Sequence, residues 1–395
     1  MFKRKLAKHL KNSLKDYDVL TLIGPRQSGK TTLTRQLFPD FDYRSLENPD
    51  ERAFANEDPK GFLSGLGQNC ILDEFQRTPQ LSSYIQGIVD EPNNKRKFVL
   101  TGSNGLLLID SITQTLAGRT ELFELLPLSY QEIVKQRKSM SLNEHMFTGG
   151  YPRIYKDKLN PTKWLRSYFQ LYVEKDIRQI TQIKNIDLFE RFVKLAAGRA
   201  GQLYNANSLA NETGVSAPTI NHWFSALKTT FICFSLQPHF KNFNKRIVKS
   251  PKLYFYDTGL LCYLLGINEA KQLETHPLRG HIFENFIISE TYKNLLNKAQ
   301  ENNLYYWRDQ KGHEIDLVLD RSSYLFPIEI KLSQTFNSGF IKNTKYFNKL
   351  QEEIGTQLPE INSQVIYCGD KENVFKNSKI TPWQNSLNKK SSKNT

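Results

Sequence analysis

The segment GPRQSGKT, residues 24–31, follows the apolar run VLTLI at 19–23 and precedes TLTRQLF at 32–38. The apolar run is typical of a buried parallel strand, and TLTRQLF is typical of a helix. The segment between them has the pattern GxxxxGK[ST], in the strand–loop–helix setting that a phosphate-binding loop requires. Backbone N–H groups of such a loop and the N-terminus of its helix attract phosphate. The segment therefore predicts an α/β domain that binds a nucleotide.

We expect this loop to bind ATP together with Mg²⁺. The ammonium group of Lys30 is expected to contact the β- and γ-phosphates, and the hydroxyl group of Thr31 to bind magnesium. The predicted nucleotide-binding residues lie in one continuous segment: Gly24, Pro25, Arg26, Gln27, Ser28, Gly29, Lys30, Thr31 and Thr32.

Two further apolar runs end in polar residues, as strands beside a phosphate-binding loop do. CILDE at 70–74 offers Asp73 as a second magnesium partner and Glu74 as the catalytic group that polarises water. A glutamate in that position favours hydrolysis over transfer of phosphate to a small molecule. KFVLTGSN at 97–104 places Ser103 or Asn104 near the γ-phosphate, because carboxyl ends of parallel strands line the ligand crevice. The same Gly-Ser-Asn is also an ordinary turn sequence.

GPRQSGKTTL, ILDEFQR, VLTGSN, LAGRTELFELLPLS and GGYPR occur in this order along the chain. In this they resemble the prokaryotic AAA-type ATPases that carry a C-terminal nuclease-like domain of unknown function. The resemblance runs from about Lys8 to about residue 350. It implies a P-loop fold with an additional strand and ATP hydrolysis in the cytoplasm. It also makes Arg119 a candidate for completing the ATP site, in the same chain or in a neighbouring subunit, although a surface arginine fits equally well.

The middle region, residues 151–270, is expected to form a helical lid and a winged helix. In SLANETGVSAPTINHWF at 208–224, a helix that ends at Gly214 and a second helix capped by Ser216 have helix-turn-helix spacing. If this module binds DNA, the outward residues of the second helix read the groove and a basic loop touches phosphates. The candidates are Thr219, Asn221 and His222 for the groove, and Lys245 and Arg246 for the phosphates. A module used only for packing or for protein contact is the alternative.

The C-terminal region, residues 271–370, carries a second candidate site. Glu284 lies in an apolar helix, Asp316 in the run HEIDLVL at 313–319, and Glu329 and Lys331 in PIEIK at 327–331. Side chains two apart on a strand share a face, so these groups are able to converge. Their order resembles that of the PD-(D/E)xK endonucleases. Asp316 and Glu329 would hold Mg²⁺, Lys331 would orient water and Glu284 would support them, whether or not nucleic acid is cleaved.

Composition limits the partners of the chain. The formal net charge of +14 favours polyanions such as duplex DNA. The four cysteines form no CxxC pair, which argues against a disulfide framework and favours the cytoplasm. No apolar stretch is long enough for a membrane span. Residues 371–395, rich in Lys, Asn and Ser, are expected to form a flexible basic tail.

The sequence thus predicts three units. These are a P-loop AAA-type parallel-sheet domain at residues 1–150, the helical and winged-helix middle, and a restriction-endonuclease-like α/β domain. The function predicted is Mg²⁺-dependent ATP hydrolysis that controls DNA binding or processing. The alternative is a non-cleaving regulatory ATPase that binds a protein partner or associates with itself.

Overall fold

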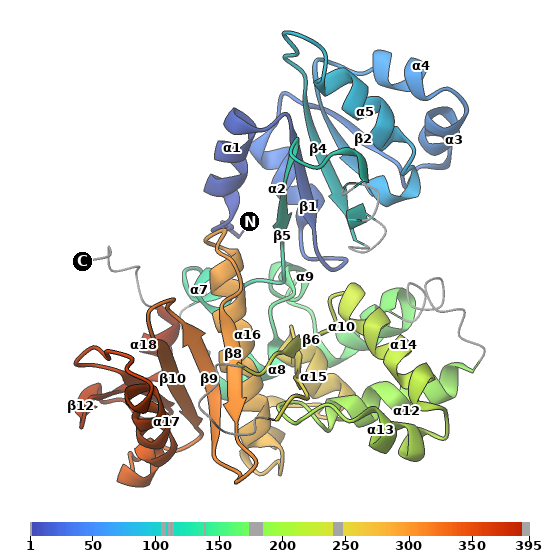
Figure 1. Cartoon of the computed structure of the whole chain (residues 1–395). Coiled ribbons are helices and arrows are strands. Elements are labelled where there is room, and N and C mark those ends of the chain that lie inside the picture. The colour runs from blue at the N-terminus through green and yellow to red at the C-terminus, as the bar shows by residue number, and fades with distance from the viewer. Residues whose placement is uncertain are drawn as a thin grey trace.

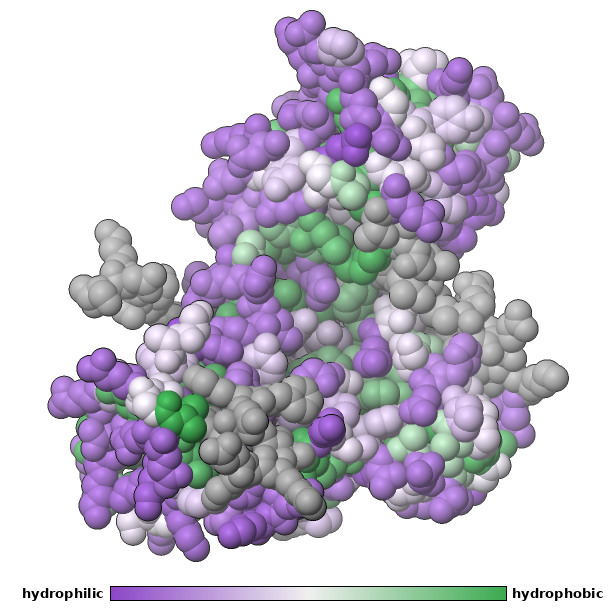
Figure 2. All heavy atoms as spheres, viewed as in Figure 1, coloured by the Kyte–Doolittle hydropathy of each residue, from purple (hydrophilic) through white to green (hydrophobic). Residues whose placement is uncertain are grey.

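The structure is a computed structural model that describes residues 2–103, 108–109, 112, 114–137, 140–173, 185–239 and 248–388. Figure 1 shows an N-terminal domain that stands above a body made of a helical part and a C-terminal sheet. On the face drawn in Figure 2, the surface is hollowed between the domain and the body, and hydrophobic side chains gather there.

The N-terminal domain is built on a parallel sheet with strand order β2-β3-β4-β1-β5. Its strands are β1 (Val19–Ile23), β2 (Asp42–Ser45), β3 (Asn69–Asp73), β4 (Lys97–Gly102) and β5 (Thr120–Glu124). The strand β4 thus lies between the strand that precedes the phosphate-binding loop and the strand that ends in Asp73. This is the additional strand that the family resemblance implies.

Helices cover both faces of this sheet (Figure 1). They are α1 (Ala7–Asp16), α2 (Lys30–Leu37), α3 (Pro49–Glu57), α4 (Pro59–Ser64) and α5 (Leu81–Val89), with a 3₁₀ turn η1 (Phe75–Arg77). Leu6 and Leu10 are fully buried against Leu20 and Leu22 of β1, so the N-terminal helix packs on the sheet through its leucine side chains.

The chain between β5 and the C-terminal region is mainly helical from residue 130 onward. Its elements are α7 (Tyr130–Val134), α8 (Leu142–Thr148), α9 (Pro152–Lys156), α10 (Pro161–Tyr168), η2 (Phe169–Val173), α12 (Ile186–Ala197), α13 (Ala206–Thr213), α14 (Ala217–Thr229), β6 (Cys233–Leu236), β7 (Lys252–Phe255), α15 (Thr258–Leu264) and η3 (Ala270–Glu274). Gly214 ends α13 with a φ of 85°, and Ser216 caps α14 by accepting from the N–H of Thr219. The antiparallel pair β6–β7 follows these helices, and the winged helix stays a prediction.

The C-terminal region forms a mixed sheet with strand order β12-β13-β11-β10-β9-β8. Its elements are α16 (Arg279–Leu296), β8 (Leu304–Arg308), β9 (Glu314–Asp320), β10 (Leu325–Lys331), η4 (Ser338–Ile341), α17 (Lys342–Glu353), β11 (Ser363–Tyr367), β12 (Asn373–Phe375), β13 (Ser378–Pro382) and α18 (Trp383–Asn388). The strand β10 pairs antiparallel with β9 and parallel with β11.

The prediction of a flexible tail from residue 371 was wrong for the part that the structure describes. The strand β13 pairs with β11, and the side chains of Trp383 and Leu387 are buried. A few apolar side chains anchor this Lys- and Asn-rich segment, because burying them compensates for the ordering of their polar neighbours. Residues 389–395 lie outside the described residues.

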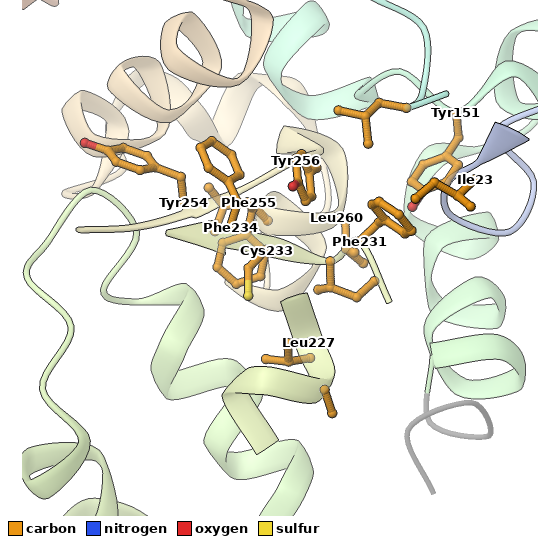
Figure 3. Close-up of a cluster of buried hydrophobic side chains, with 14 of the residues drawn as sticks. Ile23, Tyr151, Leu227, Phe231, Cys233, Phe234, Tyr254, Phe255, Tyr256 and Leu260 are labelled. Carbon is orange, nitrogen blue, oxygen red and sulfur yellow. The ribbon is translucent and has the colours of Figure 1, made fainter. Parts of the chain in front are cut away.

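One large hydrophobic cluster joins the N-terminal domain to the body. Its labelled side chains in Figure 3 run from Ile23, at the end of β1, and Tyr151 to Phe234 and Leu227 in the middle region. Within the body, the carboxylate of Asp257 accepts from the N–H of Gly150 at 2.6 Å and caps α15 by accepting from the N–H of Leu260 at 2.9 Å. The end of the P-loop strand is therefore packed into the body.

Within the described residues, none of the helices combines the length and the apolar character that crossing a bilayer requires.

Candidate functional site

The phosphate-binding loop lies at the carboxyl edge of the parallel sheet. Its two glycines have positive φ angles, 149° at Gly24 and 97° at Gly29. Any larger residue in place of Gly24 would also collide with the backbone, because its Cβ atom would lie 2.2 Å from the carbonyl oxygen of Leu125. Lys30 is buried at the start of α2, with its Nζ 2.9 Å from the carbonyl oxygens of Gly24 and Pro25. The loop thus keeps its lysine close to its own backbone.

Three hydroxyl groups fix the carboxylate of Asp73. Thr31 donates to its Oδ2 at 2.8 Å, Tyr43 donates to the same oxygen at 2.9 Å, and Thr101 donates to Oδ1. Burial, together with the negative charge of Asp73, raises the pKa of Tyr43 to about 12, which keeps this phenol a donor. The structure therefore brings together the two residues predicted to bind magnesium. They fit the ion, because Mg²⁺ beside a nucleotide takes one or two protein oxygens and completes its shell with phosphates and water.

Glu74 follows Asp73 in an unusual backbone conformation. Its φ of 55° lies in the left-handed region, which costs free energy for a residue with a side chain and recurs at functional sites. The Oε2 atom of Glu74 accepts from the hydroxyl of Ser103 at 2.9 Å and from the amide of Gln76 at 2.5 Å. Ser103 thus lies beside Glu74, as one of the two sensor alternatives requires. Asn104, the other alternative, lies outside the described residues.

The loop and Glu74 line a cleft of about 900 Å³ whose opposite wall belongs to the body. Residues 26–33 form one side, and the other side includes Arg137, Arg153 and Lys156. Arg137 is fixed by donating to the carbonyl oxygen of Tyr155 at 2.8 Å. Arg153 pairs with Asp157 at 3.2 Å, and its side chain remains 55% exposed. These three basic residues of the body side were not identified from the sequence, although Arg153 ends the GGYPR motif that contributed to the resemblance.

Arg119 lies at the opposite end of the sheet from the phosphate-binding loop. It precedes β5, and its carbonyl oxygen accepts from the N–H of Val19, the first residue of β1. Since β1 and β5 are parallel, the length of β1 separates Arg119 from the loop that follows Ile23. Its guanidinium group forms an ion pair with Asp90 at 2.6 Å. This placement contradicts a role at the ATP site of the same chain. A role in a neighbouring subunit stays a prediction, with an ordinary surface arginine as the alternative.

The predicted groove-reading residues lie on α14. Asn221 and His222 are exposed, whereas Thr219 is partly buried and hydrogen-bonded to Ser216 at 2.8 Å. The phenol of Tyr204 donates to Asn221 at 2.9 Å. Lys245 and Arg246 lie outside the described residues.

The C-terminal candidates converge in the structure. The ammonium group of Lys331 lies 3.3 Å from Oδ2 of Asp316 and also forms an ion pair with Glu329. Asp316 in addition accepts from the N–H of Ile330 at 2.8 Å. Burial, together with the charge of Asp316, raises the pKa of Glu329 well above its ordinary value. Glu284 on α16 completes the group, and its Oε1 accepts from the phenol of Tyr254 at 2.5 Å.

Two residues of this cluster, Lys252 and Glu314, were not identified from the sequence. Lys252, the first residue of β7, lies 3.2 Å from Oε1 of Glu284 and 2.6 Å from Oε1 of Glu314. Burial alone would lower the pKa of Lys252, but its neighbours, with Glu284 and Glu314 among them, raise it above its ordinary value. No local pattern could reveal Lys252, because its partners come from α16 and β9. Among the described residues, no group of three or more His, Cys, Asp or Glu side chains is arranged to hold a metal ion.

The family model for an AAA domain matches residues 16–134. Two models for domains of unknown function, DUF8612 and DUF4143, match residues 139–271 and 279–385. The uncharacterized protein Rv2008c of Mycobacterium tuberculosis is 33% identical over 338 residues, which are 84% of this chain and 74% of that protein. The chain belongs to this family of AAA-type ATPases.

One further protein and one solved structure are similar to this AAA-type ATPase at lower identity. The uncharacterized protein MJ1544 of Methanocaldococcus jannaschii is 24% identical over 387 residues, 89% of this chain and 82% of that protein. The Walker-type ATPase PABY2304 of Pyrococcus abyssi superposes with a TM-score of 0.46 at 14% identity, covering 67% of this chain and 96% of that structure.

Replacing Arg153 tests whether the body side of the cleft contacts the nucleotide. We expect Arg153→Ala to weaken ATP binding about tenfold, equivalent to about 1.4 kcal/mol, because it removes a cation facing the phosphate-binding loop. The affinity would be measured by isothermal titration calorimetry with Mg²⁺ present. Arg166→Ala, which removes an exposed arginine of α10 outside the cleft, is the matched control. Equal affinities of the two variants would contradict a role for the second wall.

Proposed function

We propose that this AAA-type ATPase binds ATP with Mg²⁺ and hydrolyses it in the cleft between the N-terminal domain and the body. The observation that carries the proposal is the contact between Thr31 and Asp73, with Glu74 adjacent and facing the same cleft. Hydroxyl and carboxylate oxygens at the end of a phosphate-binding loop are the ligands that a nucleotide-bound magnesium ion takes.

Each group of the loop has a distinct task in this proposal. The ammonium group of Lys30 offsets the charge of the β- and γ-phosphates, and the backbone of residues 24–31 surrounds them. Thr31 and Asp73 hold the magnesium ion, which supplies charge neutralisation when it is bound. Glu74 polarises the attacking water, and the hydroxyl of Ser103 holds the carboxylate of Glu74 in position.

The cleft also supports coupling between nucleotide and body. Arg153 and Lys156 lie across from the loop, and the phenol of Tyr168 on α10 donates to the carbonyl oxygen of Arg26 at 3.4 Å. A nucleotide that contacts both walls would stabilise their present arrangement. Its binding and hydrolysis would then change how the N-terminal domain packs against the helical region and the C-terminal sheet.

The target of this coupling is, in our proposal, duplex DNA. Asn221 and His222 are exposed on α14, and the chain carries a formal charge of +14. In this reading, the middle region binds DNA and the cluster of Glu284, Asp316, Glu329 and Lys331 processes it. A protein partner bound by the same surfaces is the alternative.

Replacing Glu74 tests the hydrolytic step. We expect Glu74→Gln to lower kcat for ATP about 100-fold or more, because the amide cannot accept a proton from water. Binding of ATP should remain within about threefold of the unsubstituted protein, since phosphate contacts are retained. Phosphate release and calorimetric binding would be measured together. Glu91→Gln, at an exposed position outside the cleft, serves as control. A Glu74→Gln variant of unchanged kcat would refute the assigned role.

The salt dependence of DNA binding separates DNA from a protein as partner. If about three phosphates are contacted, affinity for duplex DNA should fall roughly 40-fold between about 50 mM and about 200 mM salt, because counterions are released. Fluorescence anisotropy of a labelled duplex measures this slope. An Asn221→Ala/His222→Ala variant should bind more weakly, and Ser64→Ala, at an exposed position of α4 in the N-terminal domain, is the control. A flat salt response, or no binding, would contradict the DNA proposal and favour a protein partner.

A further inference from the structure

Arg4 is a buried cation beside the phosphate-binding loop. It lies just before α1, borders the nucleotide cleft, and its side chain is 7% exposed. Its guanidinium group donates to the carbonyl oxygen of Ser28 at 2.9 Å and to that of Leu126 at 2.6 Å. It also forms an ion pair with Glu132 at 3.2 Å. A planar guanidinium group holds its partners in a fixed geometry, so Arg4 fixes the loop, the segment after β5 and α7 relative to one another.

Glu132, the acidic partner of Arg4, is fixed in turn at the start of the body. It is 1% exposed, and its Oε1 atom also accepts from the N–H of Lys5 at 2.8 Å. Its Oε2 atom accepts from the N–H of Ser129 at 2.9 Å, in the capping box that begins α7. A buried carboxylate held by two backbone N–H groups is a rigid support, so the position of Arg4 is set by the body as well as by its own segment.

The contact of Arg4 with Ser28 sets the direction of one N–H group in the phosphate-binding loop. The Ser28–Gly29 peptide bond is trans, and the C=O and N–H of a planar trans peptide point in opposite directions. Since the carbonyl oxygen of Ser28 faces Arg4, the N–H of Gly29 points away from Arg4. The φ of Gly29 is 97°, and glycine enters many backbone conformations freely, so an outside contact is needed to fix this peptide.

We propose that Arg4 is a positioning residue that orients the Ser28–Gly29 peptide bond, so that the N–H of Gly29 donates to the phosphates of the nucleotide. Backbone N–H groups at the start of a helix are the groups with which such a loop binds phosphate, and Gly29 is the N-cap of α2. The inference rests on the proposed function. It adds that the ATP site depends on Arg4 and Glu132, which lie outside the phosphate-binding loop.

The first test is the affinity of the full chain for ATP with Mg²⁺, measured by isothermal titration calorimetry. We expect Arg4→Met to weaken binding about tenfold, because one hydrogen bond to a charged phosphate loses its alignment. The matched control is Lys3→Met, which removes the neighbouring exposed cation outside the cleft and should bind ATP as the unsubstituted chain does.

The second test observes the peptide bond itself, which a purely structural role of Arg4 would leave unchanged. Ser–Gly pairs occur at residues 28–29, 64–65 and 338–339, so ¹³C-carbonyl serine combined with ¹⁵N-glycine selects these peptide bonds in an NMR spectrum. Ser64→Ala and Ser338→Ala, both at exposed positions, remove the other two signals and thereby identify that of Ser28–Gly29.

We expect a saturating non-hydrolysable ATP analogue with Mg²⁺ to shift the Ser28–Gly29 signal of the unsubstituted chain. In Arg4→Met the shift should be roughly half as large or less, because a hydrogen bond weakens as its angle departs from linearity.

Arg4→Met leaves the buried carboxylate of Glu132 without its cation, which is destabilising. A second variant, Arg4→Met/Glu132→Gln, removes one charge of each sign and takes its place if the first does not fold. The proposal is overturned if a folded variant lacking Arg4 binds ATP as tightly as Lys3→Met, or if the analogue shifts its Ser28–Gly29 signal as in the unsubstituted chain. If the unsubstituted chain does not bind ATP, the proposed function fails as well, which distinguishes the two cases.

Discussion

The nucleotide cleft depends on one geometric constraint, the meeting of parallel strands at a common edge. The parallel strands β1, β3 and β4 are neighbours, so their carboxyl ends lie side by side. Thr31, at the end of the phosphate-binding loop, therefore hydrogen-bonds to Asp73, and Ser103 hydrogen-bonds to Glu74. Hydroxyl groups from β2, β4 and α2 then converge on the single carboxylate of Asp73. A shift of any of these strands by one residue would turn these side chains to the other face of the sheet.

The second constraint is the packing of this edge against the body. Ile23 at the end of β1 shares a hydrophobic cluster with Tyr151 and with residues of the middle region (Figure 3). The buried carboxylate of Asp257 fixes the backbone at Gly150, close before the helix that carries Arg153. The wall opposite the phosphate-binding loop is therefore positioned by the body, and in the proposed function a nucleotide in the cleft acts on both parts.

Short sequence patterns predicted the features that are determined by residues close together in the chain. The phosphate-binding loop, the strands that end in Asp73 and Ser103, the helix caps at Gly214 and Ser216, and the convergence of Asp316 with Lys331 were all expected from short segments. Arg153 and Lys252 were not recognised, because their importance comes from groups far along the chain. The tail was predicted wrongly because its average composition is polar, whereas its order depends on single buried side chains such as Trp383. The position of Arg119 depends on the parallel pairing of β5 with β1, which the sequence alone does not give.

The most direct test of the two-walled cleft is amide hydrogen exchange with and without a non-hydrolysable ATP analogue and Mg²⁺. The account predicts slower exchange in two separate segments, residues 24–32 of the phosphate-binding loop and residues 149–157 of the body. Slower exchange at 24–32 alone, with residues 149–157 unchanged, would contradict it and leave ATP bound by the N-terminal domain without contact to the body.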